Sequence, residues 1–242
     1  MLDSTVLRDF MDNFFGYGNL AAPVWFIGME EGGGASEKEI SDRLKTWHGD
    51  GPENRTVKDL AEFHLAFGDA TRFTEEKVAI QSTWSKLMRT LLVAQGETPT
   101  TERLRQYQKE KLGRSGGDAA LLELLPLPRP SMKDWDYDTW SGLPELETFA
   151  TYQSSVRPQR IAAIKALIAK CKPRAVIFYG TGYTVHWEAI AGMSFPKGHY
   201  PRVAGTAPLY MLLPHPVAHG KINQYYEAAG KILFDSGIFR IE

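Results

Sequence analysis

Short apolar runs alternate with longer amphipathic segments along this chain. The runs have the length of β-strands and contain almost no polar residues, and they occupy residues 24–27, 121–125, 175–179 and 209–213. Runs of this kind are typical of parallel strands that are covered on both faces of the sheet. We therefore expect four buried strands.

Apolar residues at helical spacing mark the segments around these runs. They predict helices at residues 4–15, 78–93, 158–171 and 221–234, and a shorter one that ends near Gly192. The polar stretch 98–117 indicates an insertion, either a helix with a solvated basic face or a mobile segment. Strands that alternate with helices predict one α/β domain over residues 1–242, a three-layer α/β/α sandwich with a central, mainly parallel four-stranded sheet.

Composition narrows the class of protein only modestly. The net charge of −1 does not indicate a nucleic-acid binder, although a local basic face would be enough for one. The single Cys171 excludes an intramolecular disulfide and a Cys-rich metal site. No run approaches the ~20 apolar residues that span a bilayer, and the N-terminus does not resemble a signal peptide. We expect a cytoplasmic monomer with no membrane association.

Two loops carry the chemistry that the sequence offers. The segment Gly28-Met29-Glu30-Glu31-Gly32-Gly33-Gly34 follows the first predicted strand, and Pro214-His215-Pro216 follows the last. In open α/β sheets the loops after the carboxyl ends of strands form the ligand crevice. We expect Glu30, Glu31 and His215 to face one pocket, which would handle positive charge on one side and negative charge on the other.

Several common site types do not fit the sequence. The glycines match neither G-x-G-x-x-G nor G-x-x-x-x-G-K-[ST], so the sequence does not favour a nucleotide-dependent dehydrogenase. His215 and His219 are four residues apart, but Pro216 disfavours the helix that would align them on a metal. The chain has no G-x-S-x-G elbow, and Cys171 sits near the end of a predicted helix as a structural thiol. We expect neither a metal nor a cofactor.

In motif order and spacing the chain resembles the uracil-DNA glycosylase superfamily. Gly28-Met29-Glu30-Glu31-Gly32 is similar to the family's GMNPG form, and His215-Pro216-Val217-Ala218 to its HPS form. The strand 175–179 and the short helix after it are similar to the family's third strand and following helix. The resemblance implies a glycosylase-like domain with DNA as partner. Its activity would be base-excision repair, in which a deaminated base is flipped out and its N-glycosidic bond is hydrolysed.

The resemblance also implies roles for single residues. Glu30 would position water and face the cationic sugar, while His215 would donate a hydrogen bond to the departing base anion. Gly28, Met29 and Glu31 would line the base, and Phe73 would stack on it. The alternatives are a solvated loop carboxylate for Glu30, a backbone-bonded histidine at a strand end for His215 and a core aromatic for Phe73. The resemblance further implies DNA contacts from Ser82, Arg129, Ser131, Lys133, Lys197, Arg202, His219 and Lys221.

Two positions depart from the family pattern and leave the substrate open. Glu31 stands where the family has Pro, and Glu123 stands at the place of the base-reading Asn. A Glu pairs with a base edge without reproducing the paired donor and acceptor of an Asn. The target would be uracil, hypoxanthine or xanthine. A protein that binds damaged DNA without efficient cleavage, and an unrelated α/β nucleoside hydrolase, remain alternatives.

Overall fold

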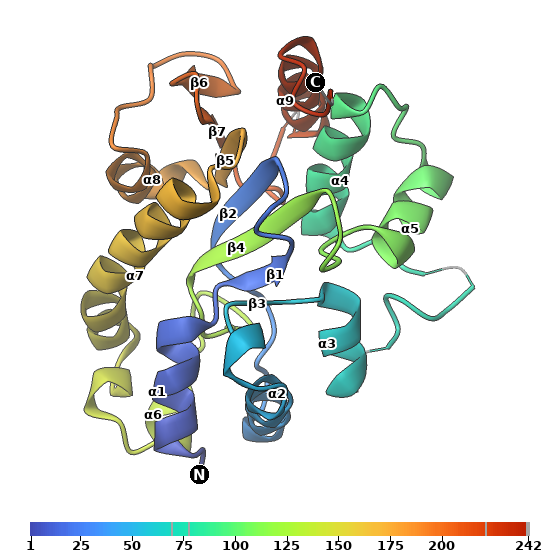
Figure 1. The fold of residues 1–242 in the computed structure, drawn as a ribbon. Coiled ribbons are helices and arrows are strands. Elements are labelled where there is room, and N and C mark those ends of the chain that lie inside the picture. The colour runs from blue at the N-terminus through green and yellow to red at the C-terminus, as the bar shows by residue number, and fades with distance from the viewer. Residues whose placement is uncertain (69, 77, 221, 241–242) are drawn as a thin grey trace.

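The fold is an α/β arrangement around one mixed sheet. A computed structural model describes residues 1–68, 70–76, 78–220 and 222–240. Within these residues the sheet has seven strands in the order β3-β1-β4-β2-β5-β7-β6 (Figure 1). Among the same residues, no helix has the length and apolar character that crossing a membrane requires.

The centre of the sheet consists of the four predicted strands. They are β2 (Val24–Glu30), β4 (Ala119–Leu125), β5 (Ala175–Tyr179) and β7 (Leu209–Leu213). Adjacent members of this group pair in parallel in the order β4-β2-β5-β7. Nearly every residue in them is buried, as their apolar composition predicts for strands covered on both faces.

The sheet is larger than the four-stranded sheet that the sequence predicts, and it is mixed. On one side β1 (Gly16–Gly18) pairs antiparallel with β4, and β3 (Val57–Lys58) pairs with β1. On the other side β6 (Arg202–Ala204) pairs antiparallel with β7. The prediction missed these strands because they have only two or three residues and include glycine and charged side chains, so no apolar run marks them.

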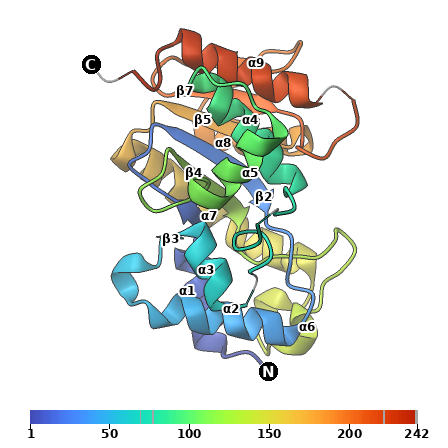
Figure 2. The ribbon, with the colours of Figure 1, turned by 90° about the vertical axis from the view of Figure 1, so that its right-hand side faces the viewer.

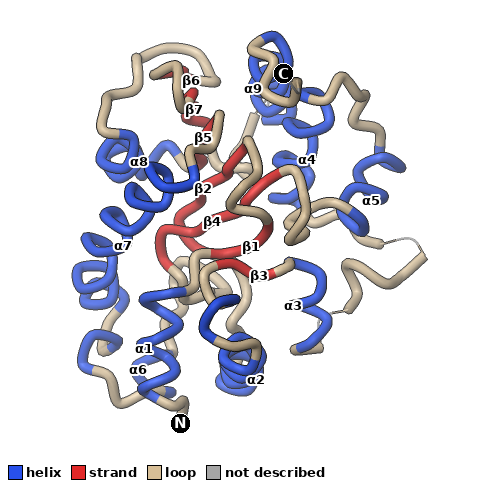
Figure 3. Tube along the Cα trace, in the orientation of Figure 1, coloured by secondary structure: helices blue, strands red, loops and turns tan. Residues whose placement is uncertain are grey.

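Helices cover both faces of the sheet. On one face lie α1 (Ser4–Asn13), α7 (Phe149–Cys171) and α8 (Thr184–Ala191), and on the other lie α4 (Ser82–Ala94), α5 (Thr101–Glu110) and α9 (Ile222–Asp235) (Figures 1 and 3). Trp187 of α8 stacks on Phe178 of β5 with ring centroids 5.4 Å apart. The side view shows α9 lying along α4 (Figure 2). Their backbones approach closely at Gly230, where a Cβ atom would lie 2.6 Å from the Thr90 carbonyl oxygen.

The remaining elements gather near the carboxyl edge of the sheet or on its flank. They are α2 (Glu37–Gly49), α3 (Leu60–Ala66), α6 (Tyr137–Trp140) and the 3-10 turns η1 (Pro52–Asn54), η2 (Pro144–Leu146) and η3 (Thr181–Tyr183). The predicted insertion 98–117 contains α5, which buries Leu104, Tyr107 and Gln108 and so belongs to the packed fold. The basic side chains of α5 are partly exposed, whereas these three residues are buried.

Two helix starts differ from the prediction. Helix α4 begins at Ser82, because the side chain of Gln81 accepts a hydrogen bond from the Trp84 backbone N–H and caps the helix there. Helix α7 begins at Phe149, well before Pro158, because Thr148 and Thr151 form a capping box. Pro158 therefore lies inside a helix that the sequence predicted it to start.

Candidate active site

A row of side chains crosses the carboxyl edge of the parallel strands. Gly28 of β2 is paired in register with Glu123 of β4, and Tyr179 ends β5 on the other side of Gly28. The Tyr179 hydroxyl donates a hydrogen bond of 2.9 Å to Glu123 Oε1. A Cβ atom at position 28 would lie 2.2 Å from the Tyr179 Oη and 2.4 Å from Glu123 Oε2. Position 28 must therefore be glycine to leave room for this contact.

His215 extends the row on the β7 side. Its imidazole lies with its centroid 6.2 Å from that of Tyr179, and the two ring planes meet at 66°. The Val217 backbone N–H donates to Nδ1 over 3.4 Å, so Nε2 carries the proton and is the free donor. Partial burial lowers the pKa of His215, which favours the neutral ring. Gly28, Glu123 and His215, which the sequence predicts as site residues, thus lie in one row.

Glu123 is unusual among the carboxyl groups at this edge because no cation in the described part of the chain pairs with it. Burial raises the pKa of Glu123 to about 8; the Tyr179 hydrogen bond opposes this rise, and the charges of Glu31 and Glu30 add to it. Its Oε2 atom is buried and has no hydrogen-bond partner among the described residues. The carboxyl group is therefore set up to keep its proton near neutral pH.

Glu30 is paired with Arg129, which the sequence predicts as a DNA contact. Arg129 Nη2 lies 2.5 Å from Glu30 Oε1, and the Arg129 guanidinium stacks 3.6 Å from the ring centre of Phe149. Arg129 is only 7% exposed, so its side chain lies against Glu30 and Phe149 and not on an exposed rim, and its role as a DNA contact stays a prediction. Burial raises the pKa of Glu30 although Arg129 opposes the rise, and Glu30 Oε2 has no partner within the described chain.

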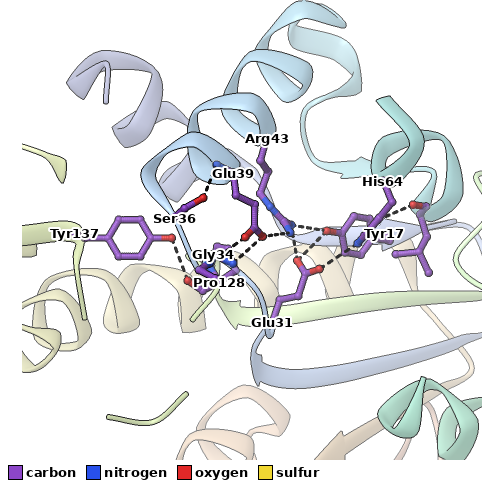
Figure 4. A network of polar contacts seen from close by, with 11 residues as sticks. Tyr17, Glu31, Gly34, Ser36, Glu39, Arg43, His64, Pro128 and Tyr137 are labelled. Carbon is purple, nitrogen blue, oxygen red and sulfur yellow. Dashed lines mark hydrogen bonds and ion pairs between the residues drawn. The ribbon is translucent and has the colours of Figure 1, made fainter. Parts of the chain in front are cut away.

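Glu31 is held in a separate polar network (Figure 4). Its Oε2 accepts hydrogen bonds from Arg43 Nη1 at 2.7 Å and from the Tyr17 hydroxyl at 2.8 Å. The other oxygen lies 3.5 Å from His64 Nε2, while His64 Nδ1 lies 2.8 Å from the Leu60 carbonyl oxygen. Burial alone would raise the pKa of Glu31, but the charge of Arg43 and contacts with His64 and Tyr17 lower it to about 2. Glu31 is therefore a fixed anion.

The glycine-rich loop after Glu31 is held by Glu39 of α2. Gly33 and Gly34 have φ angles of 118° and 74°, which side chains other than glycine rarely adopt. Glu39 accepts hydrogen bonds from the backbone N–H groups of Gly34 and Ala35 at 2.7 Å and 2.9 Å. A carboxylate thus occupies the N–H groups of Gly34 and Ala35, which a phosphate loop would offer to its ligand.

A cavity of about 560 Å³ opens beside Glu31. Its aromatic wall is formed by Phe67 and Trp84, whereas Phe73 lies against Trp84 with ring centroids 5.8 Å apart and is 6% exposed. The side chain that faces the cavity is thus Trp84, not the predicted Phe73. Polar and glycine residues complete the lining: Glu31, Gly32, Gly33, Glu39, Arg43, His64, Gly68, Arg72 and Gln81.

The other predicted contacts lie in varied surroundings. Met29 is buried in the core. Ser131 is exposed and donates a hydrogen bond to Asp134 Oδ2, and Arg202 Nη2 donates to the Tyr200 hydroxyl. Lys221 lies outside the described residues. Besides Ser131, four other predicted contacts are exposed: Ser82, Lys133, Lys197 and His219.

Several site residues were not found from the sequence. Tyr179 was assigned to a predicted strand, but its role emerges only from its register beside Gly28. Arg43 lies on the apolar face of α2 with Ile40, Leu44 and Trp47, and a charged residue at this spacing is a signal that could have marked it. His64 and Trp84 carried no such signal: His64 lies in a segment of mixed composition, and Trp84 counts only as one of the apolar positions of the predicted helix 78–93.

Metal ligands and a second cavity also bear on the kind of site. Among the described residues, no group of three or more His, Cys, Asp or Glu side chains is placed to hold a metal ion. A second cavity, of about 880 Å³, lies at the opposite edge of the sheet beside Pro173 and Pro208, away from the row.

No protein-family model matches the sequence, and no curated protein matches it.

Proposed function

We propose that the protein is a DNA glycosylase that hydrolyses the N-glycosidic bond of a deaminated base. One observation carries the proposal: Glu123, Tyr179 and His215 gather around Gly28 at the carboxyl ends of adjacent parallel strands. A base flipped out of DNA needs hydrogen bonds to its edge and charge stabilisation as it leaves. The row offers both kinds of group on one surface.

His215 supplies the stabilisation of the leaving base. Its Nε2–H is the free donor of a neutral imidazole, and hydrogen bonds to a developing anion strengthen as charge builds up. A donor placed in this way contributes about 2.7–4 kcal/mol to the transition state. Tyr179 packs against the ring and limits its movement.

Glu30 serves the sugar side of the reaction. Cleavage of the N-glycosidic bond leaves positive charge on the sugar, as in glycoside hydrolysis. Arg129 holds one oxygen of Glu30, and the second oxygen, Oε2, is free of partners among the described residues. That oxygen would orient the attacking water while its charge faces the sugar. Arg129 is then a positioning residue.

The exposed predicted contacts supply DNA binding in this proposal. Lys133 follows Met132, whose carbonyl oxygen accepts a hydrogen bond of 3.1 Å from Arg129 Nη1, so Lys133 lies near the Glu30 side of the row. Ser82 opens α4 next to Gln81 and near Trp84, which both line the cavity. Contacts from these side chains to phosphates would position the duplex without reading its sequence.

The cavity beside Glu31 favours one alternative, a hydrolase of free nucleosides. Its volume of about 560 Å³ falls within the range of small-ligand pockets, and Trp84 and Phe67 offer faces for a planar ring. The charge of Glu31 acts on Glu123, so the cavity and the row are electrostatically connected. The same carboxylates would then act on a nucleoside that is not part of a polynucleotide.

One experiment separates these functions. Purified protein is incubated with single- and double-stranded oligonucleotides that carry uracil, hypoxanthine or xanthine, and with the matching free nucleosides. Strand scission after alkali treatment identifies a DNA glycosylase, and release of base from nucleosides alone identifies the alternative. A shift in gel mobility without scission identifies a DNA-binding protein and would contradict both hydrolase proposals.

A further inference from the structure

We propose that Glu123 reads the target base as a neutral carboxylic acid, with Oε2–H as donor and Oε1 as acceptor. This inference rests on the proposed function and adds to it the class of base that is read. A neutral acid offers a donor and an acceptor side by side, as the amide of an Asn does. A protonated Glu123 therefore reproduces the paired donor and acceptor of the Asn that the resemblance leads one to expect at this position.

The geometry assigns the proton to one oxygen. The Tyr179 hydroxyl donates to Oε1, so Oε1 acts as the carbonyl oxygen. Oε2 is buried and has no partner among the described residues, and a buried polar atom of this kind calls for a ligand. Burial keeps the pKa of Tyr179 well above its ordinary value, so its hydroxyl remains a donor.

The charges around Glu123 favour its neutral form. The charges of Glu31, in the loop after β2, and Glu30, at the end of β2, act on it, and each of these carboxylates has its own arginine, Arg43 and Arg129. The guanidinium of Arg160 on α7 donates to the main-chain oxygens of Glu123 and Leu124, not to the carboxyl group. Among the described residues, no cation contacts the Glu123 side chain.

Two further elements pack against this position. The Glu123 backbone N–H donates to the Phe15 carbonyl oxygen next to β1, and Tyr226 of α9 lies near Tyr179. Neither brings a positive charge to the carboxyl group. Burial and the neighbouring carboxylates thus act together, and the pKa of Glu123 rises to about 8.

The substrate class follows from the donor and acceptor. Uracil, hypoxanthine and xanthine each have a lactam edge, an N–H next to a C=O. The N–H of the base would donate to Oε1 of Glu123, and the C=O of the base would accept from Oε2–H. An ionised Glu123 would have only acceptors and would lose the second hydrogen bond. Base reading should therefore weaken as pH rises above about 8, where a group with this pKa ionises.

The first test measures protonation without reference to activity. Urea unfolding of the wild type and of Glu123→Gln is followed from about pH 5 to pH 9. A carboxyl group whose pKa is raised on folding stabilises the folded state at low pH and loses that effect as pH rises toward the folded pKa. The unfolding equilibrium constant of the wild type relative to the variant should grow about tenfold per pH unit up to about pH 8, then level off. A flat ratio overturns the neutral acid.

The second test measures base reading. Single-turnover excision by the wild type should fall above about pH 8, whereas Glu123→Gln, which keeps a neutral donor and acceptor, should keep its rate to higher pH. Glu123→Leu should be slow at every pH. Identical pH profiles for wild type and Gln variant would overturn the inference while excision itself still supports the proposed function. No excision at any pH, with the unfolding ratio still dependent on pH, would leave a neutral acid that does not read bases.

Discussion

Single residues at the carboxyl edge show how the same side chain, glutamate, takes three different states. Glu31 is a fixed anion because Arg43 faces it, Glu30 forms an ion pair with Arg129, and the Glu123 carboxyl group accepts a hydrogen bond from the Tyr179 phenol. The three side chains are chemically the same, so the differences between their charge states come from the groups around them. Glu30→Gln would leave buried Arg129 without its ion pair. The excision rate of that variant is therefore compared with its free energy of unfolding, so that a loss of catalysis is distinguished from a loss of folded protein.

Removing the cation from Glu31 should destabilise the fold strongly. Arg43→Met leaves a mostly buried carboxylate without its partner, which costs about 3–5 kcal/mol in the free energy of unfolding. The pKa of Glu31, lowered to about 2, means that this pair stabilises the fold above about pH 4.5 and that the effect is lost as pH falls toward 2. Urea unfolding at several pH values should show the difference between wild type and variant shrinking in acid.

The matched control for this prediction lies on the same helix. Lys38→Met breaks an ion pair with Asp42 whose lysine side chain is 84% exposed, and should change stability far less. Equal losses in both variants would show that Arg43 does not act through Glu31.

Gly28 should tolerate no side chain. Gly28→Ala forces a methyl group into the Tyr179–Glu123 contact and should cost about 1–3 kcal/mol in unfolding free energy. Gly116→Ala is the control, because a Cβ atom there meets nothing within 4 Å. Thermal or urea unfolding of both variants measures the difference, and a stable Gly28→Ala would mean that the row is loosely packed.

At the scale of elements, the packing of α9 on α4 depends on the absence of a side chain at Gly230. Alanine has the higher helix propensity by about 1 kcal/mol, so Gly230→Ala would stabilise an isolated helix. Here a Cβ atom would lie 2.6 Å from the Thr90 carbonyl oxygen and 2.7 Å from Val93 Cβ. We expect a net loss of about 1–3 kcal/mol from overpacking.

Urea unfolding of the wild type and of Gly230→Ala shows whether the substitution lowers or raises the free energy of unfolding. Gln224→Ala, at an exposed position of the same helix, should leave stability nearly unchanged. A Gly230→Ala protein more stable than the wild type would show that α4 and α9 can separate without cost.

The elements differ in how far the sequence could predict them. The four central strands were predicted because burial on both faces requires continuous apolar runs. Strands β1, β3 and β6 were missed because their pairing comes from neighbours in the sheet, not from their own composition. The start of α7 was placed at Pro158 because proline favours a first turn, whereas the Thr148–Thr151 capping box begins the helix earlier.

The residues of the candidate site also divide into those that a local sequence pattern marks and those that only the fold brings together. Gly28 and His215 were predicted because their loops follow apolar runs, whereas Glu123 was named only through the resemblance to the glycosylase family. The Tyr179 contact and the Arg43 network depend on register and on the path of α2, which no local pattern encodes. Whether Glu123 holds a proton depends first on its burial and then on the charges of Glu31 and Glu30, which come from a distant part of the chain.

At the scale of the whole molecule, the net charge of −1 requires any DNA binding to come from a local set of cations. Lys133→Ala, beside the Glu30 side of the row, should weaken oligonucleotide binding and reduce the salt slope by about 1. Lys165→Ala, at the opposite edge of the sheet beside the second cavity, should leave both unchanged. Affinities at two or more salt concentrations measure this, and equal effects in both variants would contradict the assigned binding face.

We propose that the row around Gly28 breaks the N-glycosidic bond. The most direct test is the single-turnover excision rate of wild type, His215→Ala and the exposed control His199→Ala, on the oligonucleotide that the wild type cleaves best. Loss of one donor to the departing base should slow excision by about 100- to 1000-fold while the dissociation constant for DNA changes little. His199→Ala should cleave at the wild-type rate. Excision by His215→Ala at the wild-type rate would contradict the account.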